Sequence, residues 1–204
     1  MILDLDELSP AQAYFQMIQT LVPRPIAWVL SEHANGSLNL APFSYFTAVC
    51  AEPPLVLISV GHKPDGALKD TRVNIEQRGD YVIHIAHREM LEVMNASAAT
   101  LPADVSEIDQ LGLETVDFPG SRLPRLAAAR VAYACERFEI QEIGPGKQSL
   151  IIGRVKQIYV DDAIVETTAE GRIRVDAGRL DPIARLGASE YAMLSEVVNL
   201  KRPA

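Results

Sequence analysis

The chain has 204 residues, of which 48% are hydrophobic and 23% are charged, the composition of a packed globule and not of a disordered or collagen-like chain. Nineteen basic and 27 acidic residues give a net charge of −8, which argues against a general binder of the nucleic-acid backbone, since that affinity needs cationic surface. The length suits a single domain, and an all-β barrel of this size is often one unit.

The first predicted element is a helix that begins after Ser9. Residues 9–12 (Ser-Pro-Ala-Gln) form a capping box with proline at the first helical position. Four apolar residues between Tyr14 and Leu21 then fall on one helical face. Pro23 and Pro25 end the helix, because proline removes a backbone donor and clashes with the preceding turn.

An antiparallel β-meander is predicted to follow. Ile26 to Leu30 is an apolar run of strand length, and Asn35-Gly36 is a strong hairpin signal, so this run is expected to pair with the segment from Leu38 onward. Leu55 to Val60, after a Pro-Pro pair, reads as another buried strand.

The middle of the chain alternates short helices with one strand. We expect a helix from Asp70 to Gly79, a strand from Tyr81 to Ala86 and a helix from Glu89 to Ala98. A second capping box, from Asp104 to Glu107, precedes a short helix that stops at Gly112. These helices are expected to cap the barrel.

A long hairpin is predicted next. Between Val131 and Ile140 the apolar residues change from odd to even positions, which indicates a bulge near Glu136-Arg137. A turn at 144–146 (Gly-Pro-Gly) leads into a strand from Leu150 to Val160. The tail after it is expected to be loops around a short last helix near Ser189 to Val197.

Neither a secretory signal nor a membrane anchor is indicated. Asp4, Asp6 and Glu7 precede the first basic residue, Arg24, which is the wrong charge for a signal peptide. The longest uncharged stretch, 34–51, contains proline and several polar residues and cannot span a bilayer as an apolar helix. We therefore expect a cytoplasmic protein.

The sequence gives little sign of a disulfide, a metal site, a dinucleotide-binding loop or a nucleophilic serine. Cys50 and Cys135 lie far apart without CxxC spacing, so both are expected to be buried, reduced thiols. His84 and His87 are the only close histidines and have no carboxylate at a supporting spacing, so no metal site is predicted. The Gly-Pro-Gly turn lies between two strands and is not a dinucleotide loop, and no GxSxG motif occurs.

Two cationic side chains occupy positions suited to anions. Lys69 and Thr71 flank the start of the helix predicted from Asp70, where free N–H groups and the helix dipole favour a phosphate. A solvated lysine beside an ordinary cap is the alternative. Arg24 stands between two prolines before a buried strand, which suits recognition of an anion or a carbonyl, or else a surface ion pair.

Seven motifs also occur in a specific order over nearly the whole chain. They are VPRPIAWV at 22–29, NLAPFSYF at 39–46, the Pro-Pro pair at 53–54, KDT at 69–71 with NI at 74–75, MN at 94–95, LIIGRV at 150–155, and PIARLG at 182–187 with Tyr191. In these motifs the chain resembles the flavin reductase-like family, which includes flavoredoxin and the reductase components of two-component flavin monooxygenases.

The resemblance implies a mainly β fold: an FMN-binding split barrel, that is, a Greek-key antiparallel β-barrel with short capping helices, acting as a homodimer. It implies one domain over residues 1–204, with a core of about 20–160 and a C-terminal segment, 161–204, packed over the barrel.

By the same likeness the flavin site would include Arg24, Trp28, Asn39, Ala41, Pro42, Ser44, Thr47, Ser59, Lys69, Thr71, Asn74 and Arg185. Trp28 would lie near the isoalloxazine ring, while Lys69 and Thr71 would hold the phosphate, supported by Asn74. The segment 39–44 would line the ring and ribityl chain, and the segment around Arg185 would close over the site.

The implied activity is hydride transfer from NADH or NADPH to FMN, which would supply reduced flavin or electrons to a partner monooxygenase or redox protein. No catalytic side chain is expected, because the cofactor carries the hydride chemistry. Gln148 stands where related reductases often have a histidine, and glutamine cannot carry its charge. The alternatives are a flavoredoxin-like electron carrier fed by a partner protein, and a barrel that has lost its flavin.

Overall fold

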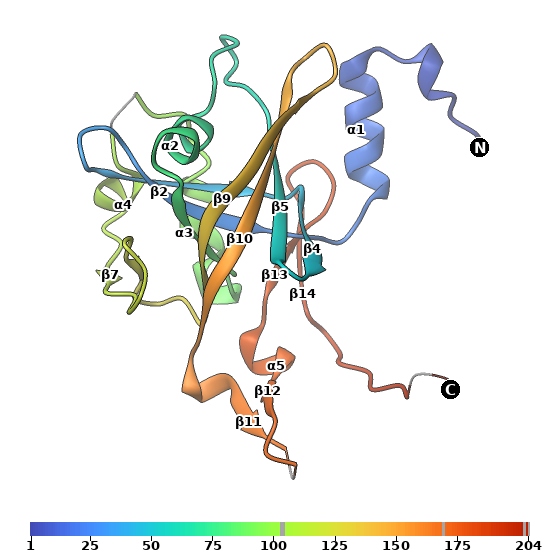
Figure 1. Cartoon of the computed structure of the whole chain (residues 1–204). Helices are drawn as coiled ribbons and strands as arrows, with labels where there is room; N and C mark the ends of the chain where they lie inside the picture. The colour runs from blue at the N-terminus through green and yellow to red at the C-terminus, as the bar shows by residue number, and fades with distance from the viewer. Residues whose placement is uncertain (103–104, 169, 202, 204) are drawn as a thin grey trace.

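The computed structural model describes residues 1–102, 105–168, 170–201 and 203, and its framework is one seven-stranded antiparallel sheet (Figure 1). The strands lie in the order β3-β2-β6-β9-β10-β5-β4. Their bounds are β2 Ala27–Glu32, β3 Leu38–Phe43, β4 Phe46–Ala51, β5 Pro54–Val60, β6 Asp80–His84, β9 Val131–Ile143 and β10 Gln148–Val160. The predicted mainly β fold is confirmed.

The sheet is curled, because its two edge strands are consecutive in the chain. β3 and β4 stand at opposite ends of the strand order, yet only Ser44 and Tyr45 connect them. The two edges therefore approach each other at these residues. The Ser59 N–H of β5 donates to the Tyr45 carbonyl at 2.8 Å, which fixes this connection against the opposite side of the sheet. We call the junction of β3 and β4 the seam.

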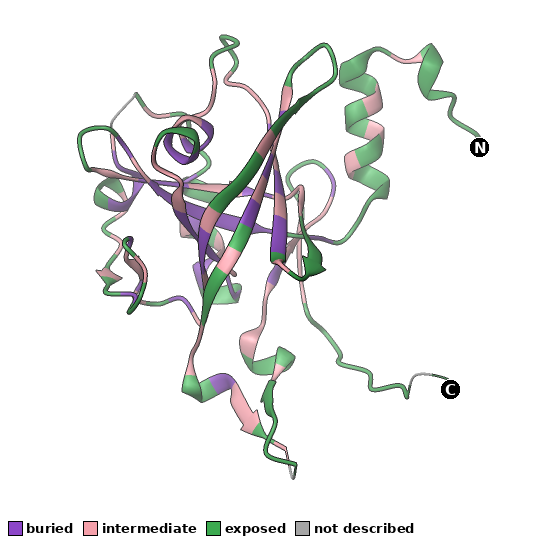
Figure 2. Cartoon of the chain, viewed as in Figure 1, coloured by how far each residue is buried: buried purple, intermediate pink, exposed green. Residues whose placement is uncertain are grey.

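Two apolar clusters fill the space on either side of β2. Ala27 and Val29 belong to the cluster inside the curled sheet, whereas Trp28 and Leu30 belong to a second cluster with Met94, because neighbouring strand residues point to opposite faces. Both faces of β2 are consequently buried. Figure 2 shows the buried residues gathered in the sheet, while the two ends of the chain are exposed.

Helix α1, Pro10–Thr20, stands to one side of the sheet (Figure 1). The predicted capping box is present: the Gln12 N–H donates to Ser9 Oγ at 3.4 Å, and the Ser9 N–H donates to Gln12 Oε1 at 3.0 Å. No residue of α1 is buried. Tyr14, Phe15 and Met17 are 57%, 47% and 46% exposed, so the described part of the chain leaves this apolar face largely uncovered.

The remaining helices are short and partly match the predictions. α2 is Asp70–Arg78 and ends at Gly79, whose φ of 84° favours glycine. The helix predicted over 89–98 is a 3₁₀ turn, η2 Arg88–Met90, followed by α3 Leu91–Ala96. α4 is Glu107–Gln110, and Ser106 Oγ caps it by accepting from the Asp109 N–H. Asp104 of the predicted capping box lies outside the described residues.

The smaller elements surround the sheet. They are η1 Leu5–Glu7, β1 Arg24–Pro25, β7 Thr115–Val116, β8 Arg125–Leu126, η3 Asp162–Ile164, β11 Val165–Thr167, β12 Ile173–Val175, α5 Ala177–Leu180, β13 Ile183–Arg185 and β14 Tyr191–Met193. β1, β13 and β14 form a separate three-stranded sheet, which holds the C-terminal part of the chain against the segment before β2.

The long hairpin of β9 and β10 contains the predicted irregularity. Ile152 pairs with Glu139 and Gly153 pairs with Arg137, so Phe138 is the extra residue, one or two positions after the expected bulge. A second irregularity, which was not predicted, leaves Lys156 without an opposite residue. Phe138 is itself 54% exposed, whereas Cys135 before it and Ile140 after it both contact the cluster inside the curled sheet.

Two predictions are wrong. The segment 189–197 contains strand β14 and no helix, because Tyr191–Met193 pairs with β13. Cys50 is exposed, because it lies on β4, an edge strand whose last five residues are all exposed. Cys135 is buried as expected. Burial raises the pKa of the Cys135 thiol. Within the part of the chain that the structure describes, no helix is long and apolar enough to cross a membrane.

Candidate functional site

Four neighbouring cavities lie along the seam and share lining residues. Ser44 lines three of them, and Lys69 lines two, so they form one hollowed path from α1 to the start of α2. The loop cavity has a volume of about 230 Å³ and includes Met94, Arg185 and Tyr191, while the outer cavity has about 450 Å³ and includes Tyr45, Thr47 and Leu57. The central cavity has about 340 Å³ and includes Ser59, His62 and Gln148. The inner cavity has about 60 Å³ and includes Asn39, Thr71 and Glu107.

The inner cavity lies at the first turn of α2. Lys69 is the residue before this helix, and its side chain makes no capping hydrogen bond. Its ammonium nitrogen lies 5.4 Å from the centroid of the Phe43 ring, and burial lowers its pKa. The N–H groups of a first helical turn have no acceptors within the helix and carry a partial positive charge. This end of the path therefore favours an anion.

A buried polar network fixes the inner cavity. The Asn39 amide nitrogen donates to Thr71 Oγ1 at 3.0 Å and to Ser31 Oγ at 3.2 Å, and the Asn74 amide nitrogen donates to Ser31 Oγ at 3.1 Å. Because Thr71 Oγ1 accepts from Asn39, its own hydroxyl hydrogen is left to donate, and Thr71 lines the cavity with 1% exposure. The structure thus brings three predicted residues together; Ser31 gave no sequence signal.

Charged groups of both signs line the inner cavity. Lys63 pairs with Asp70 at 2.9 Å, and the Glu107 carboxylate, 6% exposed, accepts from the Leu40 N–H at 2.8 Å. Burial raises the pKa of Glu107. Sequence reasoning treated Glu107 only as part of a helix cap, because its approach to β3 is a tertiary contact that no local pattern reveals.

Polar side chains from β5 and β10 meet in the central cavity. The Gln148 amide nitrogen donates to Ser59 Oγ at 2.9 Å, which leaves Gln148 Oε1 to accept. His62 and Lys69 line the same cavity, so an imidazole and an ammonium lie in the cavity that Gln148 occupies. His62 was not among the predicted site residues.

Of the uses expected for Arg24, an anion, a carbonyl or a surface ion pair, the structure shows contacts to carbonyls. Arg24 is 5% exposed, and its guanidinium donates to the carbonyls of Ile18, Leu21 and Leu186 at 2.8, 2.6 and 2.8 Å, with a longer contact of 3.4 Å to Ser44 Oγ. It is neither an ion pair nor an open anion ligand. Arg24 joins the end of α1 and the β13–β14 loop to the seam.

Trp28 is wholly buried in the core cluster. Its indole N–H donates to Ser97 Oγ at 2.8 Å, and the Ser97 hydroxyl donates to the Met94 carbonyl at 2.8 Å. With no exposed surface, the indole has no room to touch a ligand in this structure. Its hydrogen bond instead holds Ser97, which lines the inner cavity.

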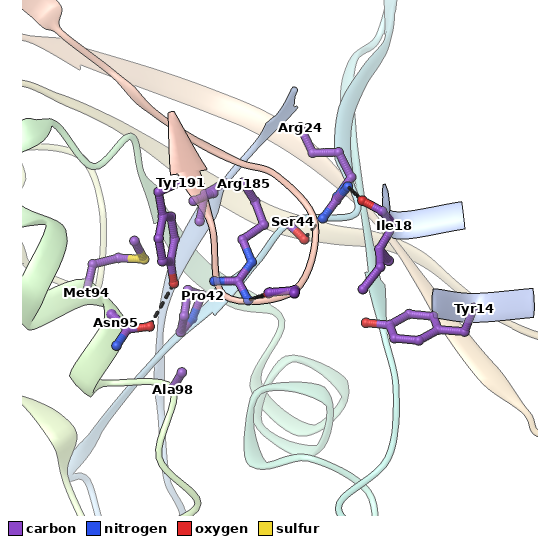
Figure 3. Close-up of a pocket in the computed structure, with 12 residues that line it drawn as sticks. Tyr14, Ile18, Arg24, Pro42, Ser44, Met94, Asn95, Ala98, Arg185 and Tyr191 are labelled. Carbon is purple, nitrogen blue, oxygen red and sulfur yellow. Dashed lines mark hydrogen bonds between the residues drawn. The ribbon is translucent and has the colours of Figure 1, made fainter. Parts of the chain in front are cut away.

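The other predicted residues are spread along the path. Figure 3 shows Arg185 pointing into the loop cavity, where it binds the Ala188 carbonyl and lies 4.5 Å from the Tyr191 ring centroid. The Tyr191 hydroxyl donates to Asn95 Oδ1 at 2.8 Å. Of the remaining predicted residues, Ala41 lines the inner cavity and Thr47 lines the outer cavity. Pro42 lines both the loop cavity and the central cavity.

His84 lies outside this path and is held neutral. Its Nδ1 donates to the Trp28 carbonyl at 3.1 Å, and its Nε2 accepts from the Leu126 N–H at 3.0 Å. Burial lowers its pKa to about 4. Within the described ranges no group of three or more His, Cys, Asp or Glu side chains is arranged to hold a metal.

Comparisons with known proteins agree with this geometry. The chain is 37% identical over 206 residues to the uncharacterized protein BH2278 of Halalkalibacterium halodurans, covering 98% of this chain and 96% of that one. Its fold is similar to nitrilotriacetate monooxygenase component B from Bacillus cereus (TM-score 0.89, 32% identity, 98% of both chains). It is also similar to the 2-nitrobenzoate 2-nitroreductase NbaA of Pseudomonas fluorescens (TM-score 0.88, 27% identity, 100% and 96% of the two chains).

The family assignment rests on most of the chain. The model of the flavin reductase like domain matches residues 19–174, which include the seam, α2 and the β9–β10 hairpin. Over these residues the curled antiparallel sheet is the split barrel expected from the sequence. The chain therefore belongs to the flavin reductase like domain family.

Proposed function

We propose that the chain is an oxidoreductase that binds FMN along the seam and transfers a hydride to it from NADH or NADPH. The observation that carries this proposal is the buried hydroxyl of Thr71, a residue that lines the inner cavity together with Lys69. An anion of phosphate size at that end leaves the rest of the path for an extended group attached to it. Family membership supports a flavin as that group.

The residues present fit the phosphate of FMN. Lys69 supplies a positive charge, Thr71 supplies a hydroxyl donor, and the first turn of α2 supplies N–H groups. Asn39 and Asn74 hold Thr71 and the helix in place through Ser31. The donors are already arranged before any ligand arrives, which reduces the entropy lost on binding.

At the other end, the chain would hold the flavin ring at Pro42 and Ser44, where the loop, central and outer cavities meet. Bound FMN supplies the hydride-accepting chemistry, so the protein has to orient the ring and limit the access of water. The β13–β14 loop with Arg185, held by Arg24 through the Leu186 carbonyl, covers one side of this region.

The central cavity is the proposed place of the nicotinamide. Gln148 has a free acceptor oxygen suited to the N–H₂ of a carboxamide, and its orientation is set by Ser59. His62 and Lys69 provide further donors in the same cavity. No group on the described residues distinguishes NADH from NADPH.

We also propose that the chain acts as a homodimer and passes reduced flavin or electrons to a partner protein. The exposed apolar side chains of α1 and of β4, Val49 among them at 51%, form a face suited to a second copy. The component name of the Bacillus cereus neighbour supports a partner monooxygenase.

A flavin titration followed by a steady-state assay tests the proposal. The protein should quench FMN fluorescence saturably, and catalytic amounts should accelerate oxidation of NADH or NADPH, followed at 340 nm, when free FMN is added. Flavin binding without accelerated oxidation would favour the flavoredoxin-like carrier, which the uncharged Gln148 in the central cavity also suits. Absence of FMN binding at micromolar concentration would favour a barrel without flavin.

A further inference from the structure

The inner cavity contains a carboxyl group that the proposed function does not use. Two ammonium groups, Lys63 and Lys69, and two carboxyl groups, Asp70 and Glu107, line it. Their charges cancel when all four groups are ionised. A phosphate dianion that enters this cavity therefore meets no net positive charge from these side chains, although the helix start favours it.

The two carboxylates differ in how they are neutralised. Asp70 pairs with Lys63 at 2.9 Å, and its side chain is 25% exposed to water. Glu107 is 6% exposed and accepts a hydrogen bond from the Leu40 N–H. A backbone N–H carries no full positive charge, so the negative charge of Glu107 is less well neutralised than that of Asp70. Of the two carboxylates, Glu107 therefore repels an incoming phosphate more strongly.

The position of Glu107 allows protonation without loss of its structural contact. β3 is an edge strand, so it has a neighbouring strand on one side only, where Leu40 pairs with Leu30 of β2. The Leu40 N–H points away from β2 and donates to Glu107 instead. A protonated carboxyl still has acceptor capacity for this N–H and gains one O–H donor. The same side chain can then hold β3 and donate to an anion.

We propose that Glu107 takes up a proton when the phosphate of FMN binds in the inner cavity, and that its O–H then donates to a phosphate oxygen. The proton comes from solvent, and no covalent bond other than that O–H bond is made or broken. The inference rests on the proposed function, since it concerns the phosphate end of the same site.

The groups that face Glu107 favour this coupling in sum. Burial, and to a smaller extent the negative charge of Asp70, raise the pKa of Glu107, while the N–H groups of Leu40 and of Glu107 itself, together with Lys63, lower it. A bound phosphate adds further negative charge and raises it again. Lys69 also titrates, and burial lowers its pKa, so loss of its proton at high pH weakens phosphate binding as well.

The test compares wild type with Glu107→Gln in FMN titrations between pH 7 and 9, where the phosphate, with its second pKa of about 6, is already a dianion. Glutamine keeps an acceptor for Leu40 and a donor toward the cavity, but it cannot titrate. The wild-type Kd should rise with pH by up to about tenfold per pH unit, and the variant should lose the part due to Glu107, so that it binds FMN more tightly than wild type at pH 9. Riboflavin, which lacks the phosphate, should show no difference between the two proteins.

A direct measurement of protons supplements the affinities. Mixing wild-type protein with FMN in weakly buffered phenol red should show net proton uptake, whereas riboflavin should show none. Glu107→Gln should take up fewer protons with FMN than the wild type, because only Lys69 can then titrate. Equal pH slopes for wild type and Glu107→Gln, or no proton uptake by the wild type, would overturn the coupling. Failure of both proteins to bind FMN at every pH would instead overturn the proposed function, and the coupling with it.

Discussion

The path of cavities has a polar end at the inner cavity and an apolar end at α1 and β4, and the chain buries the first end much more completely than the second. At the inner cavity, Asn39 and Thr71 are 3% and 1% exposed, and hydrogen bonds fix the side chains around them. At α1 and β4, Phe15 and Val49 are 47% and 51% exposed, and α1 buries no residue. One end is a preorganised polar site, and the other is an apolar surface that the described residues leave exposed.

This difference shows which features a single chain can stabilise. The buried end uses contacts between residues far apart in sequence, such as Asn39 with Thr71, and these contacts exist before any ligand binds. The exposed end has apolar side chains whose burial would stabilise the protein only when a second surface covers them. We therefore expect substitutions at the buried end to change stability or FMN affinity, and substitutions at the exposed end to change association.

The largest expected effect is a loss of stability in acid from His84, which lies outside the path but in the buried interior of the sheet. Its pKa is about 4 in the folded protein and 6.5 in an unfolded chain, so the contribution is complete above pH 6.5 and is lost as the pH falls through 4. The free energy of unfolding should decrease by about 3 kcal/mol over this window. Urea unfolding at several pH values measures it, and His84→Gln should flatten the dependence. An unchanged pH profile in that variant would show that other groups cause the loss.

The second effect concerns Lys69 at the inner cavity. Lys69→Ala should weaken FMN binding by roughly 1.5–3 kcal/mol, about 10- to 150-fold in Kd, because a charge-assisted contact is removed. Riboflavin affinity should not change. Lys147→Ala is the matched control, because its ammonium is on the turn between β9 and β10, with a side chain 71% exposed. Equal FMN affinity in all three proteins would rule out the proposed phosphate site.

A smaller effect is expected for Thr71. Thr71→Val keeps the shape but removes the hydroxyl, so FMN affinity should fall by about 1 kcal/mol, roughly fivefold. Thr71→Ser restores the hydroxyl and should restore most of the affinity in the same titration. Rescue by serine distinguishes loss of the donor from a general disturbance of the network with Asn39. A serine variant as weak as the valine variant would contradict the assigned role.

The smallest effect on the monomer is expected at α1. Phe15→Ser should change the free energy of unfolding by less than about 0.5 kcal/mol, because Phe15 is about half exposed and belongs to a helix with no buried residue. It should nevertheless shift sedimentation toward monomer, because it removes apolar surface from the proposed dimer face. A large loss of stability without a change of association state would show that α1 packs on its own chain.

Local patterns predicted much of the fold because they depend on short-range rules. The capping box at Ser9, the helix that ends at Gly79 and the bulge near residue 137 follow from capping chemistry, left-handed backbone and strand alternation. The helix expected near 189–197 failed because pairing of Tyr191–Met193 with β13 overrides local preference.

Within the candidate site, the motifs predicted which residues gather but not how they are used. Asn39, Thr71 and Asn74 meet around the inner cavity. Arg24 lines two of the cavities, as expected for a site residue, but its guanidinium binds backbone carbonyls from two distant segments. Glu107 gave no signal of its own, because its contact with Leu40 joins residues 67 positions apart.

The central claim is that NADH or NADPH reduces FMN held by this chain. The most direct measurement mixes FMN-loaded protein with each nicotinamide in an anaerobic stopped-flow instrument and follows the loss of the visible flavin absorbance over a range of donor concentrations. The account predicts fast bleaching that saturates with at least one donor. Bound flavin that stays oxidised with both donors would contradict direct reduction by a nicotinamide and would make a partner protein the source of the electrons.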